Sequence, residues 1–237
     1  MRAATVAWCL LAAALAAPAP YAPLAALEGP GALPPAPWRV AGLPKHEPTR
    51  FALVELDGVR ALRVEAERSY GHLVHDFEPP AAPRPMAWSW RVEQRNERSE
   101  LRQRWGDDTT LKVCALFDMP DEYVPFVERQ LLRVARLHTH EPLPAATVCY
   151  VWDAHLAAGT VLDNAFSRRV RYMVLEGRAA PLNRWIDERR DLAADFRELF
   201  GEESAEVPPL RAIAVGADAD NTKGRSVGYV RALRWAP

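Results

Sequence analysis

Acidic and amide side chains gather near the carboxyl terminus, in the segment "GADADNTKG" (216–224). Asp218, Asp220 and Asn221 could supply the oxygen ligands that a hard cation such as calcium prefers. The spacing does not complete an EF-hand loop, because Lys223 follows where further acidic ligands are needed. Asp and Asn also bond their own backbone in turns, and Gly224 permits a positive φ. The segment therefore predicts a turn between two strands, with a structural calcium site as the alternative.

Aromatic rings form a second candidate site, because ring faces stack on sugars while planar polar groups bond the sugar hydroxyls. Trp105 lies in the loop segment "RQRWGDD", and Tyr150 and Trp152 share one face of a predicted strand. The predicted ligand-binding surface consists of Trp105, Asp107, Tyr150, Trp152, Asp153 and Arg171. The alternative is that Tyr150 and Trp152 fill the core, as aromatic side chains on such strands commonly do.

Motifs for covalent catalysis are missing from the sequence. It contains no Gly-x-Ser-x-Gly nucleophile elbow, no P-loop and no Gly-x-Gly-x-x-Gly phosphate cradle. His138, His140 and His155 follow no metal-ligand spacing rule. Paired carboxylates are plentiful, but hydrolysis requires two that face one cleft. We therefore predict no catalytic residues and no cofactor apart from the candidate calcium ion.

The elements that must position these side chains are mostly strands. "TRFALVELDGVRALRVEAER" (49–68) contains two strands joined at Asp57-Gly58, a strong hairpin signal. In "MAWSWRVE" the alternate residues Met86, Trp88, Trp90 and Val92 are apolar, which predicts one buried face. Nine or ten such runs, separated by turn residues, indicate an all-β sandwich or barrel.

Two helical segments interrupt the strands. In the first, Val127, Leu131 and Val134 recur at helical spacing, with Arg129, Arg133 and Arg136 on another face. The second lies within "IDERRDLAADFRELFGEE" (186–203), with Asp187 or a neighbour as its N-cap and Gly201 after its end. Both are predicted to be insertions in a β-sandwich.

The amino terminus resembles an export signal. One arginine precedes an uncharged apolar run from Ala3 to Ala17, which is short for a membrane span and ends in small residues. We predict a signal peptide over 1–17, a Pro/Ala-rich linker over 18–37 and one domain over 38–237; retention of the run as an anchor is the alternative. Export would place Cys114 and Cys149 in an oxidising compartment, where they form either a disulfide or two buried thiols.

Several motifs occur in a consistent order: "MAWSWRVE", "GDDTTLKVCALFD", "TVCYVWD", "RWIDERRDLAADFRELFG" and "AIAVGADADNTKGRSVGYVRALRW". Together they resemble the bacterial domain of unknown function 3047 family, from about Trp38 to Trp235. That family has no assigned activity, so the resemblance supplies no catalytic residues to carry over to this chain. The last motif also resembles the closing strands of galactose-binding-like jelly rolls, an architecture that several carbohydrate-binding modules share. The implied fold is a jelly-roll β-sandwich.

These observations predict an exported cell-envelope protein, periplasmic or secreted, that acts as a non-catalytic binding module with a glycan as its first candidate ligand. A hydrolase that uses paired carboxylates on a glycan or ester, and a structural partner in a periplasmic assembly, are the alternatives. The net charge of -1 argues against nucleic-acid binding. No membrane span is expected after signal cleavage, and the sequence leaves the oligomeric state open.

Overall fold

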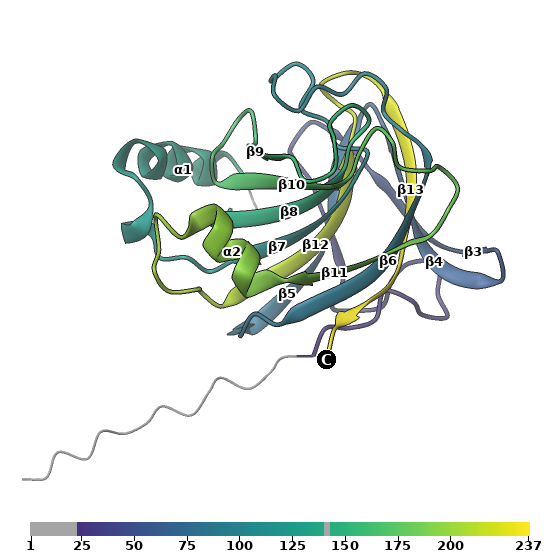
Figure 1. Cartoon of the computed structure of the whole chain (residues 1–237), viewed down its shortest axis with the longest axis horizontal. Helices are drawn as coiled ribbons and strands as arrows, with labels where there is room; N and C mark the ends of the chain where they lie inside the picture. The colour runs from purple at the N-terminus through teal and green to yellow at the C-terminus, as the bar shows by residue number, and fades with distance from the viewer. Residues whose placement is uncertain (1–22, 140–142) are drawn as a thin grey trace, which may run out of the picture.

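The strands form two sheets that pack face to face (Figure 1). The structure is a computed structural model that describes residues 23–139 and 143–237. It confirms the predicted all-β sandwich, with α1 (Phe126–His138) and α2 (Leu192–Phe200) as its two α-helices in the described residues. The predicted signal peptide, residues 1–17, and His140 lie outside the described residues.

The first sheet has the strand order β1-β5-β12-β7-β8-β10-β9, and β2 also pairs with β5. All of its pairs are antiparallel except β10 with β8 and β2 with β5. Its strands are β1 (Arg39–Ala41), β2 (Glu47–Pro48), β5 (Ser69–Ala81), β7 (Leu111–Phe117), β8 (Ala146–Trp152), β9 (Val161–Asp163), β10 (Val170–Glu176) and β12 (Leu210–Asp218).

The second sheet has the order β11-β6-β13-β4-β3, with the last strand of the chain at its centre. Its strands are β3 (Arg50–Leu56), β4 (Val59–Glu67), β6 (Pro85–Gln94), β11 (Ile186–Asp191) and β13 (Arg225–Trp235). Asp57 and Gly58 both have positive φ between β3 and β4, which confirms the predicted hairpin.

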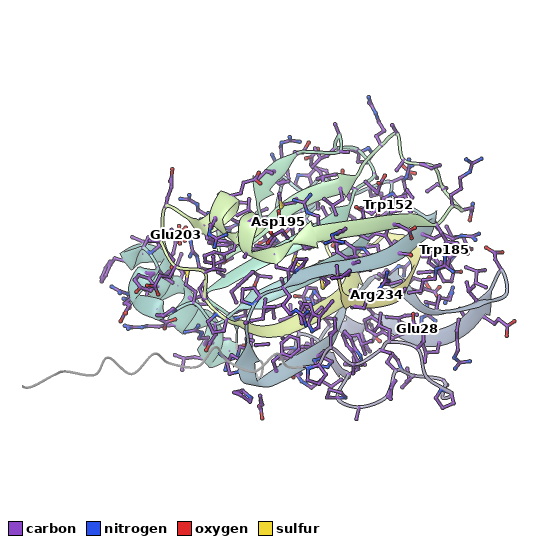
Figure 2. All side chains as sticks on the ribbon, turned by 60° about the horizontal axis from the view of Figure 1, so that its bottom comes forward. Glu28, Trp152, Trp185, Asp195, Glu203 and Arg234 are labelled. Atoms are coloured by element: carbon purple, nitrogen blue, oxygen red, sulfur yellow. A yellow bond between two sulfur atoms is a disulfide. The ribbon has the colours of Figure 1, made fainter. Side chains whose placement is uncertain are left out.

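Aromatic side chains from both sheets form the centre of the core. The predicted buried face of β6 is confirmed, since Met86, Trp88, Trp90 and Val92 are all buried. Trp88 lies 5.3 Å from Tyr150 between ring centroids, and Trp90 lies 5.6 Å from Trp152. Trp152 therefore lies between the sheets (Figure 2).

The segment before the first strand differs from the predicted linker over 18–37. Leu27 is fully buried in the core, and the Ala25 N–H donates to His75 Nε2. Glu28 lies beside the carboxyl-terminal strand (Figure 2), where it accepts a hydrogen bond from the Ala232 N–H. The described part of this Pro-rich segment therefore packs on the sandwich through Leu27 in the core, with Leu24 and Ala25 partly buried against it.

The N-cap of α2 lies four residues after Asp187, and α1 turns its apolar row outward. Asp187 lies within β11, and the N-cap of α2 is Asp191, whose carboxylate accepts from the N–H groups of Ala193 and Ala194. Gly201 follows α2 in a right-handed conformation. In α1 the predicted apolar row is exposed, while Leu132 is buried against the body of the domain.

Candidate ligand-binding cavity

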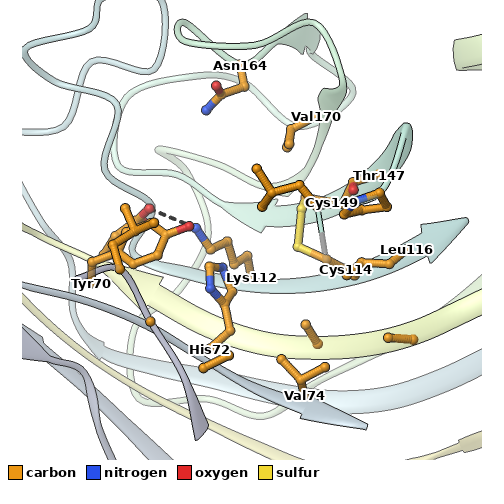
Figure 3. A pocket seen from close by; sticks show the side chains of 18 of the residues that line it. Tyr70, His72, Val74, Lys112, Cys114, Leu116, Thr147, Cys149, Asn164 and Val170 are labelled. Atoms are coloured by element: carbon orange, nitrogen blue, oxygen red, sulfur yellow. Dashed lines mark hydrogen bonds and ion pairs between the residues drawn. A yellow bond between two sulfur atoms is a disulfide. The ribbon is translucent and has the colours of Figure 1, made fainter. Parts of the chain in front are cut away.

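The first sheet is largely apolar on both faces. One face contributes to the core, and the other carries a second apolar cluster together with a cavity of about 470 Å³. We call this space the outer cavity (Figure 3). Its floor consists of outward-facing side chains of β5, β12, β7, β8 and β10, and its rim includes Leu143, Pro144 and Phe166. Its volume is in the range of sites for small molecules.

The middle of the floor is apolar and contains a disulfide. Cys114 and Cys149 are directly opposite each other on β7 and β8, and their sulfur atoms are bonded (Figure 3). Val74 and Ala214 lie on the neighbouring strands at the same level. Along β7 the floor runs from Lys112 to Leu116, a length of about 13 Å at the usual rise of a strand. A ligand resting here would contact aliphatic groups and sulfur over most of that length.

Arg39 and Arg211 line one end of the outer cavity. The opposite end, here called the polar end, contains a buried ion pair. Lys112 Nζ lies 2.8 Å from Asp218 Oδ2, and each side chain is only 5% exposed. The other oxygen of Asp218 accepts from the N–H and hydroxyl of Thr109. Burial opposes both charges, but the pair outweighs it, so the pKa of Lys112 is raised and that of Asp218 is lowered. Both groups are therefore charged at neutral pH.

Asp107 is a second carboxyl group at this end, and it titrates differently. Burial, followed by the charge of Asp218, raises its pKa to about 7. Asn164 Nδ2 donates to Asp107 Oδ2, and the Tyr172 hydroxyl lies 3.2 Å from Oδ1. Asp107 is thus present in both protonated and ionised forms near pH 7, so it can accept or donate a hydrogen bond.

Two aromatic side chains of β5 complete the polar end. Burial and the charge of Lys112 lower the pKa of His72 to about 3, which keeps its imidazole neutral. Burial raises the pKa of Tyr70 to about 12, which keeps its hydroxyl protonated. The His72 ring lies across Gly216, where an added Cβ would come within 2.7 Å of His72 Cδ2. Glycine at position 216 therefore makes room for this imidazole.

The acidic segment 216–224 is a turn between β12 and β13. Asp108 organises it, since its carboxylate accepts from the N–H groups of Asn221 and Thr222. The left-handed residue is Lys223, with φ of 55°, in place of the predicted Gly224. An added Cβ at Gly224 would come within 2.3 Å of Asn96 Oδ1, so close packing explains this glycine.

The residues of the predicted calcium site have other partners. Asp218 binds Lys112, Asp220 faces His46 at 3.4 Å, and Asn221 Nδ2 donates to Asp108. In the part of the chain that the structure describes, no group of three or more His, Cys, Asp and Glu side chains is placed to hold a metal ion.

The predicted aromatic surface is divided between three environments. Asp107 lies in the outer cavity. Trp105 is 63% exposed and lines a shallow depression beside Glu97 and His155. Tyr150 and Trp152 are buried between the sheets, as in the core alternative, so neither ring face is open to a ligand.

The remaining two predicted residues are structural. Asp153 is buried and accepts from the N–H groups of His155 and Leu156, which fixes the turn after β8. Arg171 points toward α2, where it binds Glu203 and lies 4.0 Å from the Phe200 ring centroid. The structure therefore does not bring the six predicted residues together.

The outer cavity contains residues that the sequence did not single out as a site, among them Tyr70, His72, Lys112, Asn164 and Tyr172. One signal was available. Lys112 stands in the strand "LKVCALF", where both alternating faces are otherwise apolar. A lone lysine in such a strand must find a buried partner, because an unpaired buried charge is costly.

Comparison with known proteins identifies a family. A family described as "Protein of unknown function (DUF3047)" matches residues 36–234. No curated protein matches the chain.

Proposed function

The chain belongs to the DUF3047 family of unknown function, and from that premise we propose that it is a non-catalytic binding module that holds one amphiphilic small molecule in the outer cavity. The observation that supports this most strongly is the apolar floor of a sheet face that would normally be solvated or covered by another layer. We further propose that the protein acts in the cell envelope after export. Its amino-terminal sequence and its disulfide support that location.

The shape of the cavity suggests the body of the ligand. Disulfide, valine and alanine side chains line the middle of the floor and offer no hydrogen bonds to sugar hydroxyls. An aliphatic or flat hydrocarbon body about 10 Å long would remove this surface from water, which is favourable in proportion to its area. A lipid-like body therefore fits the floor better than the glycan expected from the sequence.

The polar end suggests the head group. The charges of Lys112 and Asp218 neutralise each other, and Asp220 and the titrating Asp107 leave a local excess of negative charge. Burial and nearby carboxylates raise the pKa of Asp220, as they do for Asp107, so additional negative charge is unfavourable here. A hydroxyl or amine that donates a hydrogen bond matches this end, whereas a carboxylate or phosphate does not.

Displacement of a fluorescent probe tests the proposal. N-phenyl-1-naphthylamine is uncharged, carries an N–H donor and fluoresces in apolar surroundings, so we expect it to bind the full-length protein. A monoacylglycerol should displace it better than a fatty acid of equal chain length, and a neutral oligosaccharide should not displace it. Displacement by the oligosaccharide alone would show that the ligand is a glycan and not an amphiphile.

A variant that fills the cavity locates the binding. Ala214→Trp places an indole over the disulfide and should abolish probe fluorescence. Ala179→Trp adds the same side chain to an exposed loop that does not line the cavity, and it should leave binding unchanged. Equal binding by wild type and both variants would refute the assignment to this cavity.

A hydrolase is the second candidate, and one observation favours it. Asp107, with a pKa of about 7, and the ionised Asp218 share one cavity, as acid and base do in many hydrolases. Both oxygens of Asp218 are already engaged by Thr109 and Lys112, so it is poorly placed to act as a base. Turnover of a long-chain nitrophenyl ester that disappears in Asp107→Asn would establish the hydrolase instead.

A further inference from the structure

Helix α1 presents an apolar surface to solvent. Five of its side chains are between 54% and 83% exposed, and they occupy one broad arc of the helix: Phe126, Val127, Leu131, Val134 and Leu137. The opposite arc packs on the domain through Leu132 and Glu128. This orientation is the reverse of a typical surface helix, whose apolar stripe faces the core. An exposed cluster of this kind marks an interaction surface.

The charges of α1 are sorted between the same two arcs. Its one acidic residue, Glu128, turns inward and pairs with Arg168 and Arg169. Arg136 also turns toward the body and binds Asp121. Arg133 is exposed at the edge of the apolar arc.

Further basic groups border the arc. The Arg129 guanidinium lies 5.8 Å from the ring centroid of Phe126, next to the apolar side chains. His138 is exposed at the end of the helix. The outward surface of α1 is therefore apolar and basic, without a carboxylate of its own.

This combination matches a lipid surface with anionic headgroups. Helices that lie in the plane of a membrane bury leucine and phenylalanine at the acyl boundary and place arginine among the headgroups. No helix in residues 23–139 and 143–237 is long and apolar enough to cross a bilayer, so the contact would be made at the surface. We propose that α1 docks the protein on an anionic bilayer through its exposed apolar arc.

A second copy of the chain fits this surface less well. A helix of thirteen residues is about 20 Å long and offers a few hundred Å², whereas stable dimers bury roughly 800 Å² per partner. A two-fold contact between α1 helices would also bring like-charged arginine side chains together. A bilayer supplies opposite charge and needs no complementary groove.

The position of α1 connects the docking surface with the outer cavity. Arg136 Nε donates to the carbonyl of Leu143, which lies on the rim of the cavity. Arg168, which contacts Glu128, follows the exposed rim residue Phe166 by two positions. Docking through α1 would thus hold the rim of the cavity near the lipid. The docking proposal is independent of ligand binding, because its test measures vesicle association alone.

Vesicle flotation of the full-length protein tests the docking. We expect it to float with phosphatidylglycerol vesicles and to float much less with phosphatidylcholine vesicles. The double variant Leu131→Gln/Leu137→Gln should lose about tenfold or more in vesicle affinity, and Arg133→Glu should lose severalfold. These side chains are exposed, so circular dichroism and melting should be unchanged.

Every protein in this experiment carries the same amino-terminal apolar run, so differences in flotation come from the substitutions. Two matched control variants change residues outside α1. Leu33→Gln changes an exposed leucine outside α1, and Arg102→Glu reverses an exposed arginine elsewhere; both should bind as wild type. Equal flotation of wild type and the double variant would overturn the proposal. So would a concentration-dependent dimer, found by light scattering without vesicle binding, that Leu131→Gln/Leu137→Gln converts to monomer.

Discussion

Lys112 Nζ lies 2.8 Å from Asp218 Oδ2, so a complete ion pair is buried at one end of a mainly apolar cavity. Lys112→Met would leave the Asp218 carboxylate without its counter-charge. We expect a loss of about 3 to 5 kcal/mol in the free energy of unfolding, because breaking a buried pair leaves an uncompensated charge. Urea unfolding at pH 7 measures this. The double variant Lys112→Met/Asp218→Asn should recover part of the loss, and an unchanged midpoint for the single variant would contradict the expectation.

The raised pKa of Asp107 predicts that the stability of the fold depends on pH. In the unfolded chain it ionises near its ordinary pKa of 3.8, whereas burial and Asp218 raise the folded value to about 7. Between these values the folded state keeps a proton that the unfolded state has lost. The stability that Asp107 contributes is therefore fully present below pH 3.8 and is lost as pH rises through 7.

Asp107→Asn should remove this dependence. As pH rises from 5 to 8, wild type should lose about 2 to 3 kcal/mol in unfolding free energy through Asp107, and the variant should not. The difference between the two proteins should therefore change by that amount in favour of the variant. His72 acts in the opposite direction, because its pKa is lowered to about 3, but it is common to both proteins and cancels in the difference. Parallel stability curves for the two proteins would exclude the raised pKa of Asp107.

The disulfide should stabilise the fold as well as form the cavity floor. Cys114 and Cys149 close a loop across a separation of 35 residues. Cys114→Ala/Cys149→Ala should cost about 3 to 4 kcal/mol through the greater freedom of the unfolded chain. Thermal melting with and without a reductant checks this. The reductant should lower the melting temperature of wild type and leave that of the double variant unchanged.

Gly216→Ala should disturb the polar end of the cavity. The new Cβ would lie 2.7 Å from both His72 Cδ2 and the Gly71 carbonyl oxygen, so the ring must move. We expect a loss of about 1 to 3 kcal/mol in stability and weaker binding of N-phenyl-1-naphthylamine. Gly42→Ala is the matched control in the same cavity, because its nearest contact would be 3.6 Å. Equal effects of the two substitutions would argue against a specific role for Gly216.

Two tryptophan variants distinguish the core from the surface. Trp152 is fully buried, so Trp152→Ala should cost about 3 to 5 kcal/mol by leaving a cavity between the sheets. Trp105 is 63% exposed, so Trp105→Ala should change stability by no more than about 0.5 kcal/mol. Guanidinium unfolding of both variants measures the difference. Similar losses for both would mean that Trp105 is more deeply packed than its exposure indicates.

The elements that local pattern determines were predictable from the sequence. Alternation places Trp88 and Trp90 on one buried face, and Asp57-Gly58 specifies a hairpin, because both signals lie within a few residues. The same alternation places Tyr150 and Trp152 together, but it cannot show whether that face is buried or open. The structure shows that they pack against the tryptophans of β6.

The outer cavity was not predictable because the strands that build it are distant in sequence. Asp218 meets Lys112 and Thr109 across more than 100 residues, through the pairing of β12 with β7. Asp107 meets Asn164 and Tyr172 across separations of 57 and 65 residues. For α1, helical spacing gave the apolar row correctly, but spacing alone does not determine which arc of a helix faces the domain.

The central place of β13 in the second sheet has a consequence for synthesis of the chain. Until the ribosome releases Arg225–Trp235, the β3–β4 and β6–β11 pairs have no strand to join them. The nascent chain therefore carries two unpaired sheet edges, which are sites for aggregation. A stop codon before residue 225 would remove the middle of a sheet and not its margin. Such truncated chains should be cleared by proteases instead of accumulating as smaller folded domains.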